Sequence, residues 1–152
     1  MNVLTLQQLI PLIQTAVGPV ILISGVGLLL LSMTNRFGRV VDRSRLLARE
    51  LPGAQPALRA QLAEQLSILY RRAKIIRLAI ILATASVLLA GLLIISLFLS
   101  ALLHLEAALF VTVCFILCMG ALIGSLSVFL LDLQVSLTAL RVELDQAGFT
   151  GE

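Results

Sequence analysis

The chain carries three long apolar stretches, joined by segments in which apolar and polar positions alternate with helical spacing. These stretches cover residues 13–33, 78–100 and 107–131. Each has about the 20 residues that a helix needs to cross a hydrocarbon core about 30 Å thick. In lipid the backbone must satisfy its own hydrogen bonds, which helices do. We therefore predict an all-α membrane protein with three transmembrane helices.

The first apolar stretch is interrupted early by Gly18 and Pro19. If these residues ended a separate helix, residues 20–33 would reach only about 21 Å at 1.5 Å per residue, which is too short to span. We therefore expect one kinked span. Upstream, Thr5 with Gln8 resembles a capping box, so the first residues are expected to form an amphipathic turn at the outer interface.

Helical spacing continues beyond the spans and predicts long helical extensions. Residues 35–76 are expected to form a hairpin that turns between Pro52 and Pro56, and residues 132–147 a C-terminal helix. Apolar seams in steps of three and four residues are expected to join these helices. The seam positions are Val40, Ser44, Leu47 and Leu51 in the first arm, Leu62, Leu66, Leu69, Ala73 and Ile76 in the second, and Leu133, Leu137, Leu140 and Leu144 after the third span.

The composition indicates that the chain folds in lipid, and the distribution of charge indicates its orientation in the membrane. Hydrophobic residues make up 60% of the 152 residues and charged residues 12%, which is too apolar for a soluble domain. Ten of the eleven Lys and Arg residues lie between Arg36 and Arg77, and the other is Arg141. Because Lys and Arg in short loops stay in the cytoplasm, we predict a single membrane domain over residues 1–152, with the N-terminus outside and the hairpin and C-terminus cytoplasmic.

A basic stripe follows the first span, where three arginines fall on one helical face. Guanidinium groups at this level can bind lipid phosphates or another anion. The alternative is that they only anchor the orientation, with Asp42 paired to Arg39 or Arg45 along the helix. The candidate anion-binding residues here and at the foot of the second span are Arg36, Arg39, Arg43, Arg71, Arg72 and Lys74.

Small residues recur at helical spacing inside the first and third spans. Small residues let helices approach closely in lipid, so helix packing is one interpretation and pore lining the other. Cys114 and Cys118 are interpreted as small core residues, because positions four apart on a helix do not form an easy disulfide. The candidate packing or pore-lining residues are Gly18, Gly25, Ser32, Gly120, Gly124 and Ser127.

The sequence contains no recognisable constellation for catalysis, cofactor binding or metal binding. His104 and Glu106 are too few ligands for a closed metal site. Asp132 and the other ionisable residues fall near span ends, which disfavours a proton-coupled carrier. We therefore expect no enzymatic activity and no cofactor. We also expect no nucleic-acid partner, because the nearest polyanion to the basic segment is an anionic lipid surface.

Two motifs carry a family resemblance. GPVILISGVGLL at residues 18–29, followed by NRFGRVVDR at residues 35–43, resembles a bacterial membrane family catalogued as domain of unknown function 2721. The resemblance implies a three-span protein of the bacterial inner membrane. It implies no activity and no functional residue.

These patterns are compatible with three classes of function, namely a pore, a scaffold and an accessory subunit. Three apolar helices enclose no water, so a conduit would have to lie between subunits. Our leading hypothesis is therefore a homo-oligomeric pore or channel-like assembly. The alternatives are a non-conducting scaffold that binds anionic lipid or a partner through its basic cytoplasmic helices, and an accessory subunit of a larger complex. Ion flux separates the first two, and copurification with other proteins would mark the third.

Overall fold

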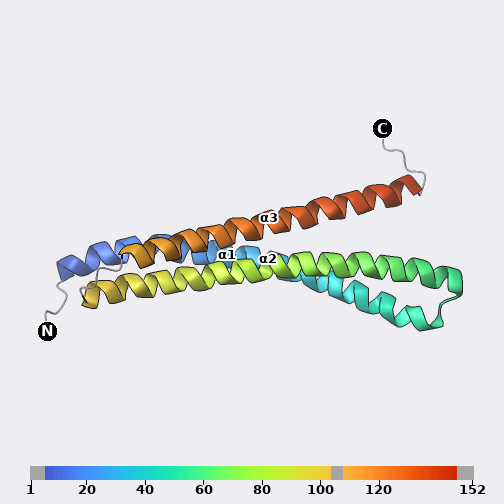
Figure 1. The fold of residues 1–152 in the computed structure, drawn as a ribbon, viewed down its shortest axis with the longest axis horizontal. Coiled ribbons are helices and arrows are strands. Elements are labelled where there is room, and N and C mark those ends of the chain that lie inside the picture. The colour runs from blue at the N-terminus through green and yellow to red at the C-terminus, as the bar shows by residue number, and fades with distance from the viewer. Residues whose placement is uncertain (1–5, 104–107, 147–152) are drawn as a thin grey trace. The chain divides into compact units, whose positions relative to one another are not determined.

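The computed structural model describes residues 6–103 and 108–146, and all regular structure in these ranges is helical (Figure 1). This confirms the all-α prediction for the described ranges. His104 and Glu106, which are too few for a metal site, and the predicted cap at Thr5 lie outside the described residues. The elements are α1 (Leu6–Glu50), the short 3₁₀ helix η1 (Leu51–Gly53), α2 (Pro56–Leu103) and α3 (Ala108–Gln146).

All three α-helices contain segments long and apolar enough to cross a membrane. These segments are Ile13–Gly53, Leu58–Leu103 and Ala108–Gln134. They indicate a multi-pass membrane protein. Pro19 lies inside α1, which continues through it, so the prediction of one first helix rather than two is confirmed.

The chain divides into two compact units, which we describe separately. The apolar unit comprises Met1–Leu31 and Ile81–Gly124, and the basic unit comprises Ser32–Ile80 and Ser125–Glu152. The described residues of the apolar unit include no Asp, Glu, Lys or Arg. All eleven Lys and Arg residues of the sequence belong to the basic unit.

The apolar unit is packed through small side chains. In lipid, close approach of helices supplies the van der Waals contact that burial from water supplies elsewhere. Cys118 donates its thiol to the carbonyl oxygen of Ser86 at 3.2 Å, and both cysteines are buried, as predicted. Large side chains such as Leu28 and Leu88 are exposed. The buried residues are Ala16, Val26, Ala83, Ser86, Ala90, Leu93, Cys114 and Cys118.

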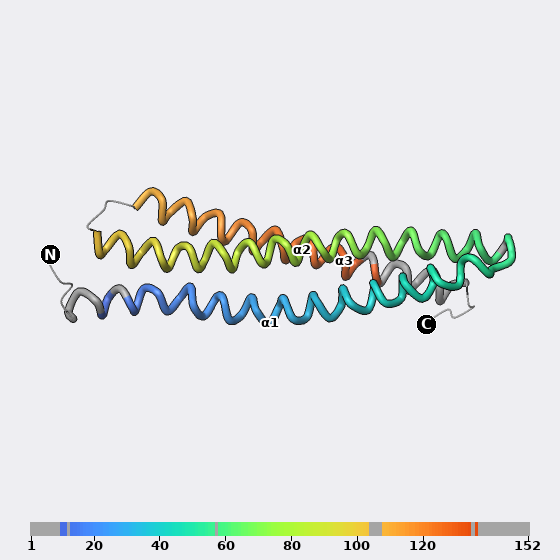
Figure 2. The backbone as a smooth tube through the Cα atoms, turned by 90° about the horizontal axis from the view of Figure 1, so that it is seen from below, coloured from blue at the N-terminus to red at the C-terminus, as the bar shows by residue number. Residues whose placement is uncertain are grey.

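The basic unit contains the predicted hairpin. α1 ends at Glu50 and α2 begins at Pro56, and Figure 2 shows the two arms running back side by side from the turn. Proline suits the first turn of a helix, where its missing N–H would have no partner anyway. The hydroxyl of Ser125 in α3 donates to the carbonyl oxygen of Ala79 in α2 at 2.7 Å.

The predicted seams are partly confirmed. Val40 and Leu47 in the first arm, and Leu62 and Ile76 in the second, are buried. The side chains predicted to continue the seam of α3 beyond Leu133 lie outside the described part of the chain. The remaining seam residues of the hairpin are only partly buried, namely Ser44, Leu51, Leu66, Leu69 and Ala73.

Candidate functional site

An ion-pair cluster joins the three helices of the basic unit. Asp132 of α3 has a fully buried side chain and lies between two arginines from different helices. Arg36 Nε of α1 lies 3.4 Å from Asp132 Oδ2, and Arg72 Nε of α2 donates to Oδ1 at 3.4 Å. Arg72 also donates to the hydroxyl of Ser136, which itself donates to the carbonyl oxygen of Asp132 at 2.8 Å.

Electrostatic attraction is what holds Arg36 in this cluster. Asp132 Oδ2 has no hydrogen-bond partner among the described residues, so its neutralisation rests on the nearby guanidinium. The Arg36 guanidinium also lies 5.7 Å from the ring centroid of Phe129, which fixes its position from a second side. A buried carboxylate without such partners would cost several kcal/mol. The cluster is therefore a fixed point of the basic unit.

The same two arginines line an open pocket of about 290 Å³, which we call the arginine pocket. It is formed by α1 and α2, and within the described part of the chain the carboxylate paired with its arginines is the buried Asp132. The four guanidinium groups of the pocket and the one carboxylate paired with them therefore leave a net positive charge. The arginine pocket is lined by Arg36, Arg39, Val40, Arg43, Leu69 and Arg72.

The structure brings together four of the six predicted anion-binding residues. The stripe of Arg36, Arg39 and Arg43 forms one wall, and Arg72 faces it from α2. Lys74 instead lies with its Nζ 4.8 Å from the ring centroid of Tyr70 on its own helix. Arg71 is exposed and is not among the residues that line the arginine pocket.

One predicted pairing was wrong. Within the described residues Asp42 forms no ion pair with Arg39 or Arg45, and its side chain is exposed. Among the described residues, Arg36 of the basic stripe pairs instead with Asp132, which the sequence analysis placed only near the end of the third span. An acidic residue next to a long apolar run was the available signal, because such a residue requires a partner. Because Asp132 is far from Arg36 and Arg72 in the sequence, the sequence alone did not show that these arginines are its partners.

The predicted small-residue positions divide into two groups. A Cβ added at Gly124 would lie 3.6 Å from Leu82 Cδ1, so here α3 approaches α2 closely. Gly18 lines a cavity of about 150 Å³ in the apolar unit. Cβ atoms built at Gly18, Gly25 and Gly120 would meet nothing within 4 Å. These three glycines, Ser32 and Ser127 are all exposed.

Comparison with known proteins yields one match. The model of a family described as protein of unknown function (DUF2721) matches residues 16–142. No curated protein and no solved structure matches the chain. The matched range contains the whole arginine pocket and Asp132, so both belong to the part of the chain that the family model covers.

Proposed function

The chain belongs to the DUF2721 family, whose description names no activity, and from the geometry we propose that it is a membrane scaffold that binds the phosphate of an anionic lipid. The observation that carries this proposal is the arginine pocket, where four guanidinium groups face one open space. Guanidinium groups present paired donors that match phosphate oxygens. The carboxylate paired with them in the described ranges, Asp132, is buried and is not among the residues that line the pocket.

The orientation of the protein supports a lipid as the source of the phosphate. We place the basic unit on the cytoplasmic side of a bacterial inner membrane and the N-terminus outside, because Lys and Arg are retained in the cytoplasm. With the first span ending near residue 33, Arg36 lies about 5 Å, Arg39 about 9 Å and Arg43 about 15 Å beyond it along the helix. Headgroups extend about 5–7.5 Å beyond the hydrocarbon core on each side, so the long side chains of Arg39 and Arg43 reach back toward them. The hairpin and the last part of α3 then extend into the cytoplasm.

Asp132 serves the pocket as a positioning residue. It holds Arg36 and Arg72 from behind, so their guanidinium groups do not have to be ordered when a phosphate binds. Arg39 and Arg43 are exposed and form no ion pair among the described residues, which leaves their charge available to a ligand. The pocket therefore combines two guanidinium groups held by Asp132 with two exposed guanidinium groups.

The double variant R39Q/R43Q is expected to bind anionic lipid at least about tenfold more weakly, because each charged hydrogen bond contributes about 1.5–3 kcal/mol. The substitutions leave the Asp132 cluster intact. Binding of a short-chain phosphatidic acid is measured by native mass spectrometry of the protein in zwitterionic nanodiscs. Inorganic phosphate is added as a competitor. If inorganic phosphate displaced the phosphatidic acid completely, the pocket would be assigned to a soluble anion.

The control variant for this experiment is R49Q/R59Q, which removes the same charge from exposed positions outside the pocket. We expect it to bind lipid nearly as well as the unmodified protein. Equal losses in the two double variants would show attraction by overall charge and would overturn the proposed site. Unchanged binding in R39Q/R43Q would do the same.

A second candidate function, a homo-oligomeric pore, is favoured by the outward face of α1. Gly18, Gly25 and Ser32 recur every seven residues and are all exposed. We propose this face as a place where subunits meet. The subunit count in lipid nanodiscs and ion flux in reconstituted vesicles test it. A closed ring of four or more subunits that passes ions would support a pore, whereas a monomer, a dimer or a ring without flux would overturn it.

A further inference from the structure

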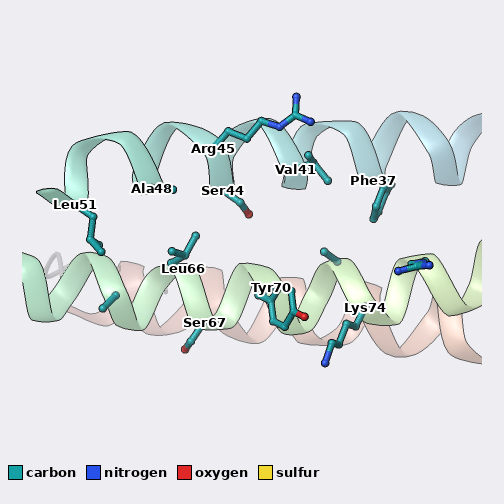
Figure 3. Close-up of a pocket in the computed structure, with 13 residues that line it drawn as sticks. Phe37, Val41, Ser44, Arg45, Ala48, Leu51, Leu66, Ser67, Tyr70 and Lys74 are labelled. Carbon is teal, nitrogen blue, oxygen red and sulfur yellow. The ribbon is translucent and has the colours of Figure 1, made fainter.

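The hairpin of the basic unit has a second open face. An apolar groove of about 710 Å³ lies between α1 and α2, and it is lined by residues of these two helices and by Leu51 of η1 (Figure 3). On α1 the groove residues Phe37 and Val41 directly follow Arg36 and Val40 of the arginine pocket. Successive helical residues point about 100° apart. The groove and the arginine pocket are therefore different surfaces of the hairpin.

The α1 wall of the groove has the spacing of a coiled-coil seam. Apart from Arg45, it consists of Phe37, Val41, Ser44 and Ala48, followed by Leu51 of η1, in alternating steps of four and three. Figure 3 shows Phe37, Ser44 and Leu51 directed toward the space between the helices. This wall is about 21 Å long.

The α2 wall repeats the same spacing in the opposite chain direction. It includes Ala63, Leu66, Tyr70 and Ala73, in steps of three and four. Two adjoining heptad seams leave holes that the side chains of a further helix fill. The groove thus fits a helix of about four turns with an apolar heptad seam. A lipid chain would not require this periodicity on both walls.

We propose that the groove binds residues 133–146 of α3 from a second copy of this chain. Leu133, Leu137, Leu140 and Leu144 follow the same steps of four and three. The residues of α3 that contact the hairpin of their own copy include Asp132 and Ser136. The leucine positions lie one residue later, about 100° around the helix. By helical spacing, these positions fall on a different face of α3 from Asp132 and Ser136.

The axial position of residues 133–146 matches the axial position of the groove. The contact between Asp132 and Arg36 places these two residues at one level. Both helices run in the same direction through the basic unit, so residues 133–146 of α3 cover about the same axial range as residues 37–50 of α1. Copies that share one membrane also share orientation and depth. A neighbouring copy therefore presents its leucine seam at the level of the groove without an axial shift.

Because the groove and the α3 segment are different surfaces, the contact is head-to-tail, and its repetition gives a ring where the rotation between copies closes and an open row of copies where it does not. This inference deepens the homo-oligomer of the second proposed function. It depends neither on ion conduction nor on lipid binding.

Disulfide cross-linking tests the contact in the full-length protein. Two copies with different tags are co-expressed without the native cysteines (C114A, C118S), one carrying A48C and the other L144C. Oxidation of the membranes is expected to join the two tags, which shifts the band to about twice the mass on a non-reducing gel. Each variant expressed alone should stay unlinked, because a head-to-tail contact does not bring identical residues together.

The matched control replaces A48C by L46C, an exposed position at nearly the same height on α1 but outside the groove. No joined band is expected with L46C. A joined band of equal strength with L46C, or none with A48C, would overturn the proposal. With both cysteines in one copy, a disulfide confined to that copy would show that its own α3 fills the groove, which also overturns it. Lipid binding by the same variants is measured in parallel, so failure of this contact is distinguishable from failure of the arginine pocket.

Discussion

Replacing Asp132 by asparagine is expected to lower the free energy of unfolding by roughly 3–5 kcal/mol, the cost of leaving one partner of a buried ion pair uncompensated. Asparagine keeps the size of the side chain but removes the charge that Arg36 and Arg72 share. Two largely buried guanidinium groups would then face each other without a counter-ion. The loss is measured as a shift of the unfolding midpoint in mixed micelles with increasing denaturing detergent.

Asp42→Asn provides the control for this experiment. It makes the same chemical change in the same unit, at an exposed residue without an ion pair in the described structure. Substitutions of this kind usually change stability by no more than about 0.5 kcal/mol. If D132N and D42N had equal midpoints, the cluster would not be a fixed point of the basic unit. The positioning role of Asp132 at the arginine pocket would then fail as well.

The helices were predictable because each depends on signals local in sequence. Long apolar runs gave the three membrane-crossing helices, and the prolines between residues 52 and 56 gave the turn. Even the wall of the arginine pocket on α1 could be predicted, since Arg36, Arg39 and Arg43 share a face by helical spacing alone. A proline inside an apolar run can either end a helix or be tolerated within it, so it is a weaker signal than the apolar runs. Pro19 does not end α1, in keeping with the length that a span requires.

The contacts between helices were not predictable in the same way. Arg72 and Arg71 are neighbours with the same charge, and only the rotation of α2 decides that Arg72 reaches Asp132 and the pocket. The same holds for the glycines, because spacing does not distinguish Gly124, which lies against Leu82, from Gly120, which is open. A repeated spacing identifies a helix face. It does not say whether that face meets a helix of the same copy, a neighbouring copy or lipid.

Ala83→Leu is expected to destabilise the apolar unit by about 1–3 kcal/mol, the usual cost of forcing extra methylene groups into a well-packed site. Ala83 is only 1% exposed and belongs to the set of small residues at which the helices of this unit pack. Lipid offers no hydrophobic gain that would compensate for separated helices. The measurement is again the unfolding midpoint in mixed micelles. Ala60→Leu makes the same change at an exposed position of the same helix and should leave the midpoint nearly unchanged. Equal midpoints for the two variants would mean that close approach at Ala83 does not hold the apolar unit together.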